Sequence, residues 1–175
     1  MFVWNACLLI AAAGFITEVP GPIKAKLAST NETSGTFVQT KTTPGGKSYV
    51  TKGEFRIRPG VDFMWKTIDP FETCFHATPT NYVYSNEDET VERKLEDLPG
   101  FSRFEGIGRG DFTMFFKAFD SLYAEEGGKF YVRSRPKVSE LKRVLSRVDA
   151  EGAATNWTLR AELPDKTVFS IQFAE

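Results

Sequence analysis

Residues 53–65 read Gly53-Glu-Phe-Arg-Ile-Arg-Pro-Gly60 and continue as Val61-Asp-Phe-Met-Trp65. In its first half, Phe55 and Ile57 alternate with charged side chains, which is the period of two expected of a β-strand with one apolar face. The proline–glycine pair that follows is a turn signal, and the second half repeats the alternation up to Trp65. The stretch therefore predicts two antiparallel strands whose apolar side chains share one face.

Runs with a similar alternation occur on both sides of this hairpin, separated by turn-rich segments such as Pro44-Gly45-Gly46. Short turns between successive strands indicate antiparallel pairing, and one apolar face per strand indicates a sheet with one covered face. We expect about ten strands, at residues 35–41, 48–58, 61–66, 74–78, 81–85, 89–96, 130–132, 141–149, 157–161 and 169–173.

A different period appears in the middle of the chain. Asp111 suits the N-cap of a helix, and the glycine pair Gly127-Gly128 would end it. Apolar residues at helical spacing would give this helix one apolar face. Such a face fits a helix packed permanently on the sheet as well as a lid over a ligand. The residues at helical spacing are Phe112, Phe115, Phe116, Phe119, Leu122 and Tyr123.

The composition points to an apolar interior and excludes several functions. The 16 phenylalanines supply apolar area without a polar group, which suits a thick core or a cavity for apolar ligands. Lys and Arg number 22 against 23 Asp and Glu, so the net charge of -1 gives no sign of nucleic-acid binding. One histidine, His76, and two cysteines, Cys7 and Cys74, are too few for a zinc site of these residue types. Because no acid/base pair with a nucleophile can be assembled, we expect no enzyme, no metal and no cofactor.

Residues 1–16 are apolar and uncharged. This run is too short for a transmembrane helix, which needs about 20 residues. It suits the apolar region of a secretory signal with Ala11-Ala12-Ala13 as the cleavage site, although no basic residue precedes it. A buried N-terminal strand or helix is the alternative. We expect a signal peptide at 1–16 and a single domain at 17–175.

The order of the strand signals resembles the LolA-type outer-membrane lipoprotein carrier family. The resemblance rests on Gly35-Thr-Phe-Val-Gln-Thr-Lys41, the strand from Gly53 to Pro59, Phe63-Met-Trp65 and Pro70. The family has a Phe-x-Gln strand, a Gly-initiated strand ending in Arg-Pro, a Phe-x-Trp and a proline-containing turn in this order. The resemblance extends over residues 23–173, with specific motifs in the first half and a similar pattern in the second.

The resemblance implies a mainly β (α+β) fold. The curved antiparallel sheet would form an open half-barrel, covered by one to three helices around an apolar cavity. It also implies a monomeric periplasmic carrier that takes acyl chains of a lipoprotein, or a related exported lipid, from an inner-membrane donor toward an outer-membrane acceptor. A sensor or adaptor domain of the same fold, which binds lipoprotein or a protein partner, is the alternative.

The resemblance also suggests which residues line the acyl cavity. The family's arginine before the proline closes the lid through hydrogen bonds, and Arg58 is the candidate for this latch. When residues 53–65 are aligned with the family's pattern without a gap, Arg58 lies one residue before the family's arginine. The alternation of the strand places Arg58 on the same face as Glu54 and Arg56. A β-bulge would correct this; otherwise Arg58 is a surface residue and the latch is absent or replaced. The expected acyl-binding residues are Phe37, Phe55, Ile57, Phe63, Trp65, Phe112, Phe115, Phe116 and Phe119.

Overall fold

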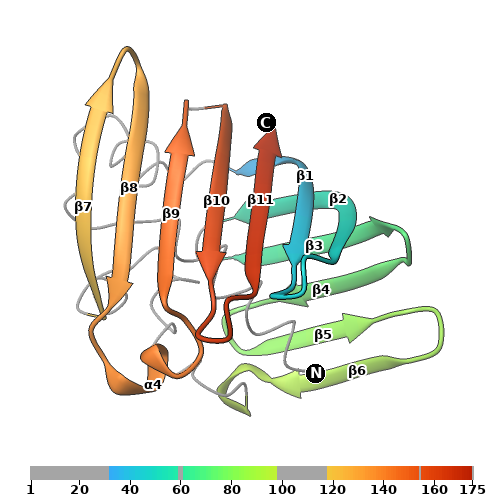
Figure 1. The fold of residues 1–175 in the computed structure, drawn as a ribbon. Coiled ribbons are helices and arrows are strands. Elements are labelled where there is room, and N and C mark those ends of the chain that lie inside the picture. Colours follow the sequence, from blue (N-terminus) through green and yellow to red (C-terminus); the bar gives the residue numbers. More distant parts are fainter. Residues whose placement is uncertain (1–31, 59–60, 98–117, 154, 175) are drawn as a thin grey trace.

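The computed structural model describes residues 32–58, 61–97, 118–153 and 155–174. In this part of the chain, eleven strands form one antiparallel sheet in the order β6-β5-β4-β3-β2-β1-β11-β10-β9-β8-β7 (Figure 1). The first and the last strand are therefore neighbours in the middle. The strands are β1 (Thr33–Thr42), β2 (Ser48–Arg58), β3 (Asp62–Asp69), β4 (Thr73–Ala77), β5 (Asn81–Ser85), β6 (Thr90–Lys94), β7 (Phe119–Glu126), β8 (Lys129–Pro136), β9 (Arg147–Gly152), β10 (Asn156–Glu162) and β11 (Val168–Ala174).

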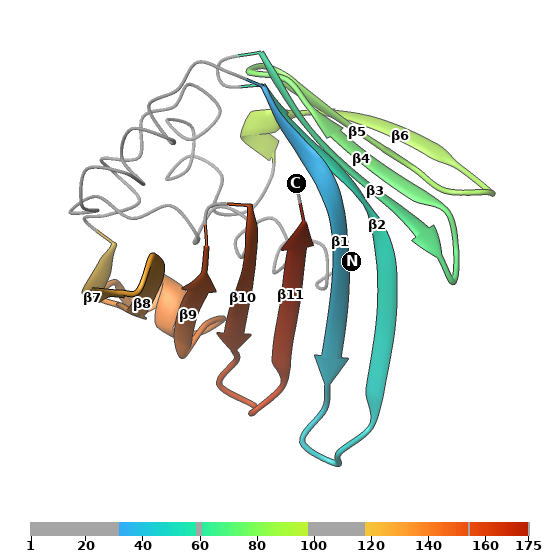
Figure 2. The ribbon, with the colours of Figure 1, turned by 90° about the horizontal axis from the view of Figure 1, so that it is seen from above.

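The sheet is open, because its two end strands, β6 and β7, are not paired with each other. It is also strongly curved, so that its two halves enclose a concave inner face (Figure 2). Curvature of this kind follows from the right-handed twist that accumulates from strand to strand. The predicted mainly β fold with one open antiparallel sheet is confirmed. Residues 1–16 and the part of the helix expected at 111–123 that precedes residue 118 lie outside the described residues.

The pairing register sorts the side chains onto the two faces. Directly opposed residues of antiparallel strands point to the same side, and β1 pairs with β11 so that Phe37 faces Phe173. In β2 and β3, Phe55 faces Trp65 and Ile57 faces Phe63. The inner face of the central strands is therefore apolar, as the alternation predicts, and the charged residues of the same strands lie on the outer face.

The predicted helix at 111–123 is wrong from Phe119 onward. The chain there forms β7, which pairs with β8 from Phe119 opposite Pro136 to Glu126 opposite Lys129. The glycines expected to end the helix, Gly127 and Gly128, instead close this hairpin, and both have positive φ angles. Two adjacent residues with positive φ suit a tight hairpin turn that matches the twist of the strands.

The strand predicted at 141–149 is wrong in its first half. Residues Ser139–Lys142 form a short helix, α4, and the strand β9 begins only at Arg147. Leu141 and Leu145 are buried, and this turn packs them against the inner face near β8 and β9. A short 3-10 helix, η1, follows β6 at Leu95–Asp97. In the part of the chain that the structure describes, no helix is long and apolar enough to cross a membrane.

Candidate functional site: the aromatic inner face

A chain of ring contacts runs across the inner face from β5 to β3. Tyr82 on β5 stacks on Phe75 of β4, with ring centroids 5.6 Å apart. Phe75 lies 6.3 Å from Phe63 on β3, and the centroids of Phe63 and Trp65 are 6.4 Å apart. All of these separations are in the range in which aromatic rings attract one another.

The same chain of rings continues into the other half of the sheet. Trp65 contacts Phe173 on β11 edge to face at 6.1 Å, and Phe173 stacks on Trp157 of β10 at 4.2 Å. Trp157 in turn lies 6.5 Å from Phe130 on β8. Aromatic contacts thus connect β5 with β8 across the middle of the sheet, and they join residues that are far apart in the sequence. This aromatic inner face is the candidate functional site.

The middle of this face depends on a glycine. Phe37 on β1 and Trp65 on β3 stack with ring centroids 3.8 Å apart, although β2 lies between their strands. Phe37 is directly opposite Gly53 of β2. A Cβ at Gly53 would lie 2.6 Å from the Phe37 ring and would collide with the backbone oxygen of Lys66. The absence of a side chain at Gly53 therefore lets the two rings meet over β2.

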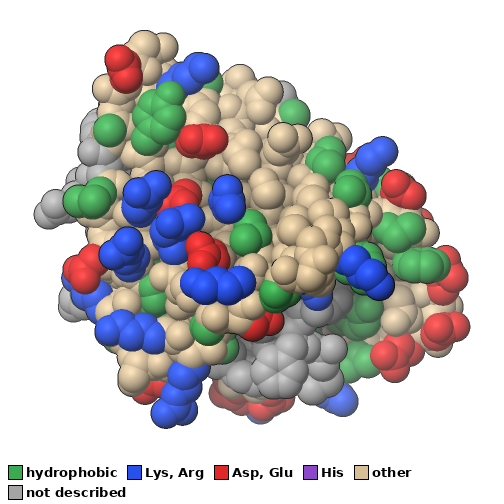
Figure 3. All heavy atoms as spheres, in the orientation of Figure 1, with side chains coloured by type: hydrophobic (Ala, Val, Ile, Leu, Met, Phe, Trp, Pro, Cys, Tyr) green, Lys and Arg blue, Asp and Glu red, His purple; other side chains and the backbone are tan. Residues whose placement is uncertain are grey.

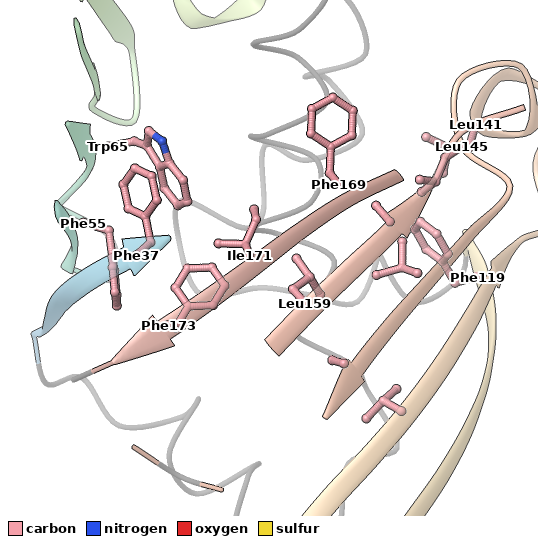
Figure 4. Close-up of a cluster of buried hydrophobic side chains, with 14 of the residues drawn as sticks. Phe37, Phe55, Trp65, Phe119, Leu141, Leu145, Leu159, Phe169, Ile171 and Phe173 are labelled. Atoms are coloured by element: carbon pink, nitrogen blue, oxygen red, sulfur yellow. The ribbon is translucent and has the colours of Figure 1, made fainter. Parts of the chain in front are cut away.

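The aromatic inner face contains a fully buried centre and a partly accessible margin. Phe37 and Phe173, in the centre, are 1% and 3% exposed (Figure 4). Apolar side chains around them pack against this core and remain only half-buried. Half-buried apolar groups are the part of the face that a ligand could still remove from water. They are Ile57, Phe63, Tyr82, Phe130 and Trp157.

The structure brings five of the expected acyl-binding residues together. Phe37, Phe55, Ile57, Phe63 and Trp65 lie on the inner face of β1, β2 and β3. Their role in binding acyl chains stays a prediction.

Phe119 lies elsewhere. It is buried on β7, and Figure 4 places it beside Leu141 and Leu145 rather than with the Phe37–Trp65 pair. Phe112, Phe115 and Phe116 lie outside the described residues.

Five aromatic members of the site are absent from the expected acyl-binding residues, and two of them are Tyr82 and Phe130. Phe75, Trp157 and Phe173 belong to segments that were expected to be strands, so their alternation was visible in the sequence. The place of Trp157 and Phe173 on the same face as Phe37 depends on the pairing of β1 with β11, which are far apart in the sequence. The alternation along a strand shows which side chains share a face, but it does not show which strands lie beside it.

A compact charged cluster lies on the outer face, behind the aromatic site. The Asp62 carboxylate, 4% exposed, accepts hydrogen bonds from two guanidinium nitrogens of Arg58: Nε, at 2.7 Å, and Nη2. Arg56 Nη2 lies 3.4 Å from Asp62 Oδ2, and His76 Nε2 lies 3.0 Å from the same oxygen. The cluster therefore joins β2, β3 and β4. These hydrogen bonds, with those of Arg58 the largest cause, hold the pKa of Asp62 well below its usual range.

The candidate latch residue is part of this cluster. Arg58 is opposite Asp62 in the β2–β3 ladder, on the face away from Phe55 and Ile57. The only register shift between β2 and β3 in the described residues lies between Lys52 and Gly53, too far back to turn Arg58 inward. The guanidinium is bound within its own hairpin, and a latch role for Arg58 remains a prediction. No local signal marks Asp62 as the centre of a cluster, because its partners come from two other strands, β2 and β4.

The outer face of the other half of the sheet, over β8 to β10, is polar and carries several ion pairs. Arg133 and Arg147 both donate from Nε to Asp149, each at 2.9 Å. Arg147 also reaches Glu162 at 3.4 Å, and Lys166 reaches Glu162 at 3.1 Å. Figure 3 shows the blue basic side chains gathered over β8 to β10 on this face. The two faces of the sheet thus differ sharply in chemistry: aromatic inside, charged outside.

Side chains that bind metal ions do not gather in the described part of the chain. Among the described residues, no group of three or more His, Cys, Asp and Glu side chains could hold a metal ion. The buried polar residues near the inner face are Gln39 and Ser134, and Ser134 Oγ is 2.9 Å from Ser121 Oγ. What the arrangement can do is take apolar surface out of water.

No protein-family model matches the sequence, and no curated protein matches it either. Among solved structures, the chain is similar to a LolA superfamily protein from Nitrosomonas europaea. The TM-score is 0.44 and the identity is 8%, over 97% of this chain and 91% of that chain. A likeness of this degree assigns no function to this chain.

Proposed function

We propose that the protein is a periplasmic carrier that holds acyl chains of a lipoprotein, or of a related exported lipid, against its aromatic inner face. The observation that carries this proposal is the continuous row of rings from Tyr82 to Phe130, whose centre is buried and whose margin is half-buried. The resemblance of residues 35–65 to LolA-type carriers supports the same function.

The energetics of such a site suit reversible binding. Each methylene group removed from water contributes roughly 0.8 kcal/mol. A chain of about a dozen methylenes would gain on the order of 10 kcal/mol, from which the entropy lost on binding must be subtracted. Contacts between methylenes and rings have no strict geometry, so the chain can slide along the face. Binding can therefore be firm while the cargo still passes from an inner-membrane donor to an outer-membrane acceptor.

The chemistry of the site favours binding over catalysis. The half-buried side chains at the margin carry no acid or base apart from the phenol of Tyr82. The charged Asp62 cluster, which holds His76, lies on the other face of the sheet. Among the described residues, a ligand on the aromatic inner face would meet rings and aliphatic groups rather than a paired acid and base.

A transfer assay tests the proposal directly. Donor vesicles carry a fluorescent diacylated lipopeptide together with a quencher, and acceptor vesicles carry neither. We expect catalytic amounts of the purified protein to accelerate appearance of fluorescence in the acceptor vesicles several-fold over spontaneous exchange. A sensor or adaptor would bind the lipopeptide without accelerating its transfer, and this result would overturn the carrier function while keeping the acyl site.

The matched control separates the site from unspecific effects of protein on vesicles. Phe63→Glu places a charge among the half-buried rings, where an unpaired carboxylate is costly. Val38→Glu places the same charge on the outer face of β1. The proposal requires loss of acceleration in the first variant and retention in the second. Equal acceleration by both variants would contradict it.

A further inference from the structure

The long hairpin of β1 and β2 has an open strand edge at its distal end. β2 pairs with β1 from Ser48 opposite Thr42 to Ile57 opposite Thr33. Its ladder with β3 covers only the residues from Lys52 to Arg58. In the described part of the chain, residues 48–51 therefore have a strand on one side only. Figure 2 shows the hairpin running out past the turn between β10 and β11, while β3 diverges from it.

The side chains at this edge are apolar and accessible. Tyr49 is 55% exposed and Val50 is 47% exposed, which is unusual for two adjacent large apolar residues of a strand. The end strand β6 differs in this respect. β6 reads Thr-Val-Glu-Arg-Lys, and its charged residues protect its edge from pairing. An unpaired edge with exposed apolar side chains is a template for a further strand.

The charges around the edge select the partner. Residues 33–53 contain Lys41, Lys47 and Lys52 and no acidic residue, and the one acidic residue paired with these lysines in the described strands is Asp69 of β3, opposite Lys52. Lys47 and Lys52 are exposed and flank the open edge at its two ends. A second copy of this chain, paired antiparallel at the same edge, would bring Lys47 of one chain next to Lys52 of the other. This like-charge contact opposes self-pairing and favours an acidic strand.

We propose that residues 48–51 of β2 are a docking site for an extended segment of another protein, which adds to the sheet as a β-strand. The segment has apolar side chains in its middle and acidic side chains at its ends. Backbone hydrogen bonds to the open edge supply its affinity, contacts with Tyr49 and Val50 supply apolar burial, and Lys47 and Lys52 pair with its acidic ends. This inference depends on the strand edge and not on acyl binding.

The test uses the full chain and a designed peptide. The peptide is acetylated and amidated, with glutamate at both ends and alternating valine and threonine between. We expect saturable binding, with amide hydrogen exchange slowed at residues 48–51 and unchanged in β6. Two control peptides separate the contribution of the acidic ends from that of the backbone hydrogen bonds. Replacing both glutamates by lysine reverses the charge, and methylating alternate backbone nitrogens removes hydrogen bonds; each should weaken binding roughly tenfold or more.

Two variants locate the site on the protein. Lys47→Glu with Lys52→Glu should weaken binding of the acidic peptide roughly tenfold. The matched control, Lys129→Glu with Lys142→Glu, reverses two exposed lysines far from the hairpin and should leave binding unchanged.

Several results would overturn the proposal. These are no binding at all, protection at β6 or β7 instead of residues 48–51, or equal binding of the methylated peptide. Adsorption of the hairpin to vesicles containing anionic phospholipid, with no peptide binding, would identify a membrane surface as the partner instead.

Discussion

The rings of Phe37 and Trp65 stack with their centroids 3.8 Å apart although the strand β2 runs between them. This contact joins the first strand of the chain to the third and lies at the centre of the aromatic inner face. It exists because the residue of β2 beneath the rings, Gly53, has no side chain. Gly53, the first residue of the segment 53–65, thus has a packing role in addition to opening the alternating strand.

Gly53→Ala is expected to destabilise the protein by roughly 2–3 kcal/mol, the usual cost of forcing an atom into a packed core. The added methyl group would collide with the Phe37 ring and with the Lys66 backbone oxygen, and backbone cannot move aside cheaply. Gly45→Ala is the control, because a Cβ there meets no atom within 4 Å. Its unfolding free energy should change by less than about 0.5 kcal/mol. Urea unfolding measures both; equal stability of the two variants would refute the role of Gly53.

Asp62→Asn should make stability less dependent on pH. The folded-state pKa of Asp62 lies below its ordinary value because Arg58, His76 and Arg56 favour the carboxylate. Its contribution is therefore complete above the unfolded-state pKa of about 3.9 and is lost as the pH falls from there toward the folded-state value.

At pH 7 the Asp62→Asn variant should be less stable by roughly 2 kcal/mol, the scale of hydrogen bonds to a charged group. The difference from wild type should shrink as the pH falls below about 4. Denaturant unfolding between pH 7 and pH 2 gives the two curves, with Glu87→Gln at an exposed turn as the control. A difference that is the same at every pH would show that the carboxylate charge is not what matters.

The hairpin from Gly53 to Trp65 was predictable because each strand alternates strictly and a proline–glycine pair separates them. The segment at Phe119 was not, because aromatic residues at 119 and 123 with Leu122 between them fit a helical stripe and a strand equally well. Pairing with β8 decides between the two, and the glycine pair at 127–128 supports either a helix end or a hairpin turn. Local period cannot separate these outcomes.

The candidate site also has one part that was predictable from the sequence and one part that was not. The shared face of Phe55, Ile57, Phe63 and Trp65 follows from alternation within two adjacent strands. The addition of Phe173 and Trp157 depends on the pairing of β1 with β11, between opposite ends of the chain. The Asp62 cluster depends likewise on three strands being in register. Sequence reasoning gave the faces of the strands, and the long-range pairing that completes the site needed the structure.

The Cys74 thiol should react slowly with alkylating reagents. Burial raises its pKa, while the Lys66 ammonium group, opposite it in the β3–β4 ladder, acts in the other direction. Iodoacetamide at pH 8 should modify Cys74 several-fold more slowly than a small free thiol, because the thiolate is the nucleophile. Lys66→Met should slow the reaction further. Peptide mass mapping separates Cys74 from Cys7, and faster alkylation in the variant would contradict this account.

The central claim is that acyl chains bind to the aromatic inner face, and a titration with a fluorescent fatty acid tests it most directly. Wild type, Phe63→Glu and Val38→Glu are compared, with circular dichroism as the check that each is folded. We expect Phe63→Glu to weaken binding at least roughly tenfold, because the carboxylate adds an unpaired charge among the rings. Val38→Glu, on the outer face of β1, should bind like the wild type. Equal affinity of all three folded proteins, or no binding by the wild type, would contradict the claim.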